Sequence, residues 1–186
     1  VSGVTQNNIL FGSNGYTVVG TQDSFVLKLS SAGSFQSLTG YGIANQAVTL
    51  TNMVLDNNGN LYLGGSFEGT LAKNGWSITA NKGGADLFFI KDGSTPANQW
   101  AATGGSSNGD GLQGMDITSK GELVFTSFFL DGTFSGGTKS VTGTSSSWIS
   151  SLDADVMMGG LTASGGWSWL DATQSNALEV GWDIAV

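Results

Sequence analysis

Short runs of apolar residues alternate with turn residues along the whole chain, and no window shows the spacing of an amphipathic helix. In residues 24–29 the side chains of Phe25, Leu27 and Leu29 recur at every second position, which places them on one face of a strand. Residues 87–90 are apolar throughout, as expected for a strand buried on both faces. The pattern predicts an all-β chain. The expected strands are 9–11, 16–19, 24–29, 35–39, 49–55, 61–67, 87–90, 100–103, 112–118, 123–129, 140–142, 148–152, 166–170 and 178–186.

The pattern repeats. The stretch 59–71 returns as 121–134, and Gly59 and Gly121 are 62 residues apart. A third copy lies near the start of the chain, because Phe11, Leu71 and Phe134 each precede a similar turn and strand. Self-similarity at a fixed period is the signature of a repeat array. We expect one array over residues 1–186 with about three copies of a unit of about 62 residues, over 1–71, 72–134 and, incompletely, 135–186.

Other segments align at the same period and support the repeat. One is a strand that begins with an aspartate, one is an aromatic position that opens a short strand, and one is a three-residue segment whose first and last residues are apolar. The matching segments are 23–28, 86–91 and, weakly, 147–152 for the first, Phe35, Trp100 and Trp167 for the second, and 53–55, 115–117 and 182–184 for the third.

One strand of the unit has no third copy. Strand 61–67 returns at 123–129, but no similar segment precedes residue 9 or follows residue 134. Four antiparallel strands in 40 to 60 residues predict a β-propeller blade, and rings of blades typically contain four to eight. Three blades are therefore too few to close a ring. We favour a larger propeller of which this chain is a part, and completion by strands of another subunit stays open.

Composition excludes several classes of function. Only 11% of the residues are charged, and polarity comes from Ser, Thr, Asn and 30 Gly, whereas six Trp and ten Phe supply a core that disordered chains lack. The net charge of −8 and the absence of Arg argue against nucleic acids and against a basic membrane-binding face. There is no Cys, so neither a disulfide nor a thiolate metal site is expected. No apolar run is long enough for membrane insertion.

Three segments carry the pattern of a known family: Gly83–Lys91, Trp100–Gly105 and Asp56–Thr70. The last reads Asp-Asn-Asn-Gly-Asn-Leu-Tyr-Leu-Gly-Gly-Ser-Phe-Glu-Gly-Thr. These residues resemble the bacterial β-propeller repeats of the SBBP type, and the similarity covers most of residues 9–186. The resemblance implies an all-β propeller of four-stranded blades and an exported, often surface-associated protein. It implies no reaction, because propellers host many functions.

No catalytic or metal-binding constellation stands out. Residues 105–109 fit G-x-S-x-G, but the chain has no His to activate a serine. Residues 56–60 resemble the start of a calcium loop, but its twelfth position is Phe67, so a plain turn is expected. Asp153 and Asp155 could bind a cation or cleave a glycoside, although solvated surface charge is the simpler interpretation. We therefore expect no catalytic residue, no metal and no cofactor.

Trp167 and Trp169 are the candidate ligand-binding residues. Trp169 follows the aromatic position of the repeat by two residues, so both rings would lie on one face of a regular strand. They could add to the core or form a platform on which a sugar ring stacks.

These observations favour a non-catalytic extracellular, cell-surface or virion repeat module rather than an enzyme. It would act as a scaffold or adhesive surface with a protein or glycan partner. One alternative is a carbohydrate-binding or glycan-cleaving domain that uses Trp169 with Asp153 and Asp155. Another is a self-assembling fibre subunit that neighbouring chains complete.

Overall fold

A computed structural model describes the chain except for residues 74, 94, 131, 144–153 and 174–180. The described residues form β-strands and a single 3-10 turn, η1 (Pro96–Asn98), with no α-helix among them, so the predicted all-β class is confirmed. The strands are β1 (Ser2–Thr5), β2 (Ile9–Phe11), β3 (Asn14–Tyr16), β4 (Asp23–Leu29), β5 (Phe35–Tyr41), β6 (Val48–Leu55), β7 (Leu61–Phe67), β8 (Thr70–Lys73), β9 (Trp76–Thr79), β10 (Asp86–Asp92), β11 (Trp100–Gly105), β12 (Asp110–Ile117), β13 (Leu123–Leu130), β14 (Thr133–Gly136), β15 (Lys139–Thr142), β16 (Ala154–Leu161) and β17 (Trp167–Ala172).

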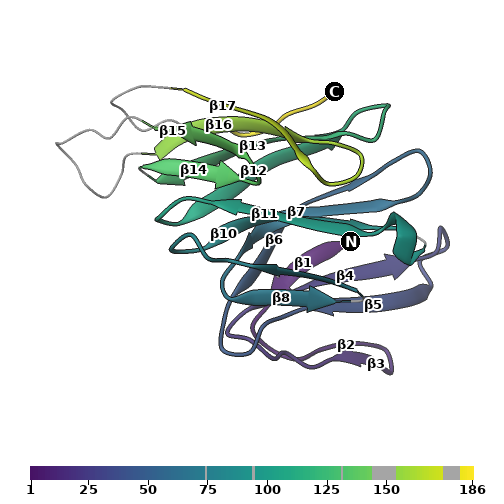
Figure 1. The fold of residues 1–186 in the computed structure, drawn as a ribbon. Helices are drawn as coiled ribbons and strands as arrows, with labels where there is room; N and C mark the ends of the chain where they lie inside the picture. The colour runs from purple at the N-terminus through teal and green to yellow at the C-terminus, as the bar shows by residue number, and fades with distance from the viewer. Residues whose placement is uncertain (74, 94, 131, 144–153, 174–180) are drawn as a thin grey trace.

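Three antiparallel sheets form successive layers from the N-terminus to the C-terminus (Figure 1). We name these layers unit 1 (β1-β4-β5), unit 2 (β6-β7-β10-β11) and unit 3 (β12-β13-β16-β17), in the order in which their strands are paired. The sheet of unit 2 continues through β14 to β15, because Gly104 pairs with Gly136. Among the described residues no sheet closes on itself, so a propeller ring is not shown.

Each unit carries a short hairpin at the same point of its sequence. Hairpin β2-β3 lies between β1 and β4, hairpin β8-β9 between β7 and β10, and hairpin β14-β15 between β13 and β16. The hairpins have the same place in the three units, and the array of three copies stays a prediction. The links between units fall at residues 42–47 and 106–109, so the structural units are offset from the copies 1–71, 72–134 and 135–186.

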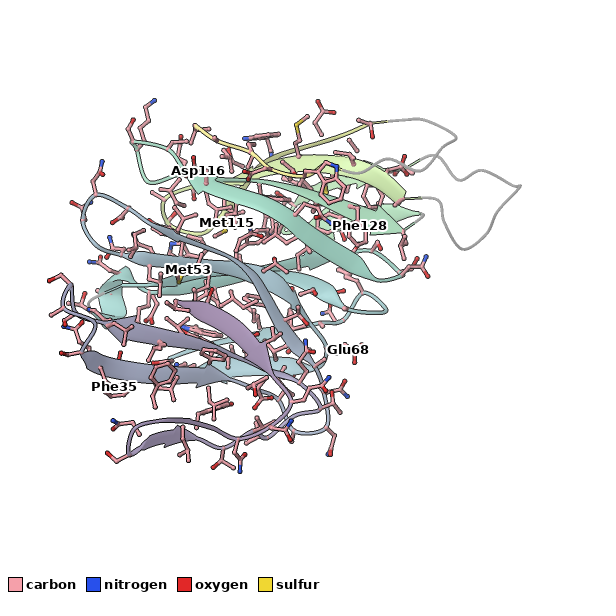
Figure 2. The ribbon with its side chains drawn as sticks, turned by 180° about the vertical axis from the view of Figure 1, so that it is seen from behind. Phe35, Met53, Glu68, Met115, Asp116 and Phe128 are labelled. Carbon is pink, nitrogen blue, oxygen red and sulfur yellow. The ribbon has the colours of Figure 1, made fainter. Side chains whose placement is uncertain are left out.

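Two apolar cores hold the layers together. One lies between units 1 and 2 and includes Val26, Leu50 and Phe88. The other lies between units 2 and 3, where the rings of Phe89 and Phe125 lie 4.7 Å apart. Burial of apolar surface between the sheet faces is the main force that stabilises such a stack. Figure 2 shows Met53 and Met115 at the same position on successive layers, with Phe35 on the first layer.

The third copy of the strand 61–67 is present after all, as β1. Asp23 at the start of β4 pairs with Thr5, as Asp86 of β10 pairs with Phe67 and Asp155 of β16 pairs with Phe129. Strand β1 therefore occupies the place of β7 and β13. The expectation of no third copy was wrong because the four residues of β1 share the register of β7 but not its glycine-rich sequence.

The third unit also differs from the expected alignment. We expected residues 147–152 to match strands β4 and β10, but residues 144–153 lie outside the described residues. The place of β4 and β10 is taken by β16, which begins one residue before Asp155. The sequence Asp-Val-Met-Met at 155–158 is the counterpart of Asp-Leu-Phe-Phe at 86–89, with flexible thioethers in place of two aromatic rings.

Residues 181–186 lie across the outer face of unit 3, the face that points away from unit 2. The Val186 N–H donates to Asp116 Oδ2 at 2.8 Å, and a side chain at Gly114 would meet the Asp183 Cα at 2.7 Å. We expected a strand over 178–186. Residues 181–186 form none, and 178–180 lie outside the described residues.

Candidate functional site

Three hairpin turns gather at one end of units 2 and 3 and enclose a polar cleft of about 450 Å³. A smaller hollow of about 350 Å³ shares Lys91 and Ala163 with it, and we call the two together the turn-end groove. It lies between the layers, so residues of both units line it. The principal lining residues are Asp56, Asn58, Lys91, Trp100, Lys120 and Ser164.

Asp56 shapes the first turn of the groove. Its Oδ1 accepts the N–H groups of Asn58 and Asn60 at 2.9 Å each, and its Oδ2 accepts the Asn60 side-chain amide at 2.8 Å. Gly59 closes the turn with a φ of 77°. Desolvation opposes ionisation, but the bonds from Asn60 and Asn58 and the charge of Lys91 lower the pKa of Asp56 below its ordinary value. The carboxylate thus has the hydrogen bonds of a hairpin turn, as the sequence predicts.

Lys91 and two aromatic rings form the other wall. The Lys91 Nζ lies 5.4 Å from the centroid of the Tyr62 ring, and Trp100 packs edge-on against the same ring at 6.1 Å. The Trp100 Nε1–H donates to the Ala163 carbonyl at 3.0 Å, which ties unit 2 to unit 3 at this end. The groove therefore combines an ammonium group, aromatic surface and turn amides, which are the groups that recognise hydroxylated ligands.

Trp167 is partly buried and packs against the core between units 2 and 3. Its ring packs against Phe89 and Phe125 at 5.8 Å and against Phe134 at 6.0 Å. A side chain at Gly136 would collide with the indole, so the glycine makes room for it. The surroundings of Trp167 are those of a core residue that joins units 2 and 3.

Trp169 lies on the opposite face. A bulge between Gly160 and Leu161 shifts the register, so Trp167 pairs with Leu161 and Trp169 pairs with Gly160. The face of Leu161 is buried in the core, whereas Trp169 is 41% exposed on the outer face. The expectation that both rings share a face fails because the strand is not regular. Trp169, and not Trp167, takes the place of Trp100, which pairs with Lys91 in unit 2.

The two acids of the glycan-cleaving alternative are not shown as a pair. Asp153 lies outside the described residues. Asp155 is 2% exposed at the start of β16, so its interpretation as a solvated surface charge was wrong. Residues 105–109, which fit G-x-S-x-G, form the link between units 2 and 3, where the Ser106 N–H donates to Asp110 Oδ2 at 2.8 Å.

A pair of buried carboxyl groups, which sequence reasoning missed, joins units 2 and 3. Asp86 and Asp110 are 1% and 4% exposed, and each has an Oδ1 without a hydrogen-bond partner. Gly105 lies between them: a side chain there would collide with Asp86 Oδ1 and lie 3.1 Å from Asp110 Oδ2. Desolvation and, to a lesser degree, the charge of Asp86 raise the pKa of Asp110 to about 7.

No group of three or more His, Cys, Asp or Glu that could hold a metal ion occurs in the part of the chain that the structure describes. Nor does that part contain a helix with the length and apolar character needed to span a membrane.

Neither the scan against protein-family models nor the search of curated proteins found a match. The resemblance to SBBP repeats and the functions that it implies stay predictions.

Proposed function

We propose that the units are propeller-type blades of an exported surface module that is not an enzyme, and that its turn-end groove binds a glycan. The stacked antiparallel units, one of three strands and two of four, each with a hairpin at the same place, support the blade arrangement. The observation that carries the binding function is the groove itself, in which Lys91 and Trp100 from unit 2 face the turns of unit 3.

The chemistry of the groove suits a sugar that carries a carboxylate. The charge of Asp56 is held by Asn58 and Asn60, whereas the ammonium groups of Lys91 and Lys120 line the cleft. An ammonium can pair with a uronate, turn amides and hydroxyls can bond sugar hydroxyls, and the exposed part of Trp100 offers an apolar surface to a sugar ring. A glycan with uronic acid residues is therefore the ligand class with the best fit.

Binding to a panel of neutral and uronate-containing polysaccharides, measured by calorimetry, tests the proposal. We expect Lys91→Met to weaken binding at least tenfold, which is about 1.4 kcal/mol. Lys28→Met is the matched control, because Lys28 holds the same register position in unit 1, outside the turn-end groove. Failure of every glycan to bind the wild-type chain, or equal losses in both variants, would count against a glycan site in this groove.

A second binding surface has a specific observation in its favour. Trp169 is exposed on the outer face of unit 3 beside Met158, so its ring is accessible to a planar or ring-shaped ligand. Loss of glycan binding in Trp169→Ala, with binding retained in Lys91→Met, would move the site to that face.

A further inference from the structure

Asp86 and Asp110, the carboxyl pair, lie at the opposite end of the same two strands as the turn-end groove. Strand β10 begins at Asp86 and carries Lys91 of the groove near its end. Strand β12 begins at Asp110 and leads into the turn 118–121, which lines the groove. The two strands belong to neighbouring layers and contact each other across the junction (Figure 1). A change in how closely the layers meet at the carboxyl pair therefore reaches the groove along two continuous strands.

The carboxyl pair is a departure from the repeat at the second junction. Asp110 stands at the position that Val48 has in unit 2, opposite the last aromatic residue of the neighbouring strand. There it meets Asp86 across Gly105. Both side chains are buried, and each keeps an Oδ1 without a hydrogen-bond partner. Two ionised carboxylates in such a site repel each other strongly because little water screens them, and a proton on either one removes that repulsion.

Few charged groups surround the carboxyl pair. Lys82, in the loop before β10, acts on Asp86, whereas the link 106–109 and strand β14 carry no charged residue. On the other side Phe129 of β13 pairs with Asp110, and Asp155 of β16 lies beyond Phe129. The chain has no His. Burial and, to a lesser degree, the charge of Asp86 raise the pKa of Asp110 to about 7, so this carboxyl gains or loses its proton near neutral pH.

Short contacts hold the junction at both of its ends. Beside the carboxyl pair, β11 and β14 pair through two residues each, and Gly105 opposite Ser135 is one of these pairs. At the groove, the bond from the Trp100 Nε1–H to the Ala163 carbonyl joins the layers. The groove is lined by both units, so a ligand contacts all of its walls only when the layers are closed on each other.

We propose that a proton on the carboxyl pair closes the junction between units 2 and 3 and thereby raises the affinity of the turn-end groove for its glycan. Loss of the proton leaves two buried charges, which favour separation of the layers at that end. Once the layers separate, water reaches Asp110, which then holds its proton only near pH 4 like an ordinary carboxyl. Proton and glycan both favour the closed junction, so each strengthens the binding of the other. The proposal rests on the proposed function, because it concerns the ligand of the same groove.

Calorimetry with a uronate-containing polysaccharide at pH 6 and pH 8 measures the effect on binding. Lysine ammonium groups keep their charge over this range, so the direct contacts in the groove do not titrate. We expect the Kd to rise about threefold to tenfold from pH 6 to pH 8, because release of one proton shifts the closing equilibrium by at most about tenfold. A Kd that is the same at both pH values overturns the proposal and leaves the glycan site in place.

Variants outside the groove test whether the carboxyl pair is responsible. Asp110→Asn removes the titrating group, and we expect its Kd to be the same at pH 6 and pH 8. Asp110→Val, which restores the residue type of Val48, is the second variant and should behave in the same way. Asp171→Asn is the matched control, because Asp171 is exposed on β17 outside the junction, and it should keep the pH dependence of the wild type. A pH dependence that persists in a folded Asp110 variant overturns the proposal.

The free protein offers a test that needs no glycan. The Trp100 indole N–H bonds across the junction, so its NMR signal, identified by its loss in Trp100→Phe, reports closure. We expect this signal to shift between pH 6 and pH 8 in the wild type and to stay fixed in Asp110→Asn.

The two measurements separate the possible failures. A titrating Trp100 signal in a chain that binds no glycan rejects only the binding function. A signal that does not titrate overturns the control by the carboxyl pair, whether or not a glycan binds. Calcium chloride that produces at pH 8 the spectrum seen at pH 6 would assign the carboxyl pair to a cation and overturn the proposal.

Discussion

At the junction between units 1 and 2 a buried hydroxyl makes two hydrogen bonds, whereas the junction between units 2 and 3 leaves buried oxygens, among them Oδ1 of Asp86 and Oδ1 of Asp110, without a hydrogen-bond partner. At the first junction the Ser24 hydroxyl donates to the Val48 carbonyl and accepts the Leu50 N–H, both at 2.7 Å. The position of Ser24 in unit 2 is taken by Leu87, which can do neither. The two junctions share one geometry but differ in what stabilises them.

The repeated aspartates show the same contrast. Asp23 accepts hydrogen bonds from the Tyr16 hydroxyl at 2.7 Å and from the N–H groups of Val19 and Gly20 at 2.8 and 3.0 Å. Asp86, its counterpart, accepts the Asn81 N–H at 3.0 Å and leaves Oδ1 beside Asp110. A stack of this kind thus tolerates a fully bonded acid in one layer and a titratable pair in the next, because the apolar faces carry most of the stability.

The largest difference between the junctions should appear in their response to pH. Because the pKa of Asp110 is raised to about 7, the folded chain binds a proton that the unfolded chain releases near pH 4. Its contribution to stability is fully present below pH 4 and is lost as the pH rises to about 7, by up to roughly 4 kcal/mol. Among the described residues, the charge that acts on Asp110 is that of Asp86, and the charge that acts on Asp86 is that of Lys82.

Asp110→Asn removes this dependence. We expect the variant to be more stable than the wild type at pH 8 and equal to it near pH 4, measured by urea unfolding across that range. Val48→Asp puts a carboxyl at the equivalent position of the first junction, where it should create a new pH dependence. Parallel stability curves for the wild type and Asp110→Asn would contradict the raised pKa of Asp110.

The second largest difference in stability should come from aromatic packing. Trp167→Ala removes a ring that contacts Phe89 of unit 2 and two rings of unit 3, and we expect a loss of about 3 kcal/mol. Phe35 has the same register in unit 1 but belongs to neither apolar core. We expect Phe35→Ala to cost less than about 1 kcal/mol in a monomer, as a matched substitution outside the cores. Equal losses in thermal unfolding would show that the ends of the stack are packed as tightly as its middle.

The hydroxyl of the first junction gives a smaller effect. Ser24→Ala leaves the Leu50 N–H and the Val48 carbonyl buried without their partner, at a cost of about 2 kcal/mol. Ser37→Ala, at an exposed position of the same sheet, is the control and should leave the unfolding midpoint unchanged. A midpoint shift in the control as large as that in Ser24→Ala would contradict the specific role of the Ser24 hydroxyl.

The smallest effect concerns the second junction. Asn52 donates its side-chain N–H to the Gln113 carbonyl at 3.2 Å, between the first strands of units 2 and 3. Asn52→Ala should destabilise the chain by about 1 kcal/mol in urea unfolding. An unchanged stability would mean that water replaces this contact at no cost.

Strong local patterns allowed the all-β class and many of the strands to be predicted from sequence, but not the short hairpin strands β8, β9 and β14. Strands with clear alternation or a glycine-bounded apolar run, such as 61–67, 35–39 and 123–129, lie within one or two residues of their expected bounds. Strand β1 could not be found because it is short and its register depends on pairing with β4, a contact distant in sequence. Periodicity reports the face that a residue occupies in a regular strand, and the bulge beside Gly160 breaks that rule for Trp169.

The candidate site was less accessible to prediction. Asp86 and Asp110 lie close together only because two layers stack. Asp110 occupies the position that the apolar Val48 has in unit 2, so this position could not be recognised as part of the repeat from the sequence. The turn-end groove combines turns from three hairpins with a lysine at the end of a buried strand. Each of these elements alone is an ordinary turn or strand, so the groove and the carboxyl pair are recognised only from the way the layers are arranged.

The layered arrangement also gives the molecule a mechanical direction. Within a layer, backbone hydrogen bonds run continuously from strand to strand, whereas apolar faces, the short pairing of β11 with β14 and side-chain bonds such as Trp100 to Ala163 connect one layer to the next. A force along the stack peels apolar faces apart one layer at a time, while a force along the strands must shear whole ladders at once. If the chain were pulled from its two ends, the layers would separate one after another, and the chain would lengthen in steps at the short links 42–47 and 106–109.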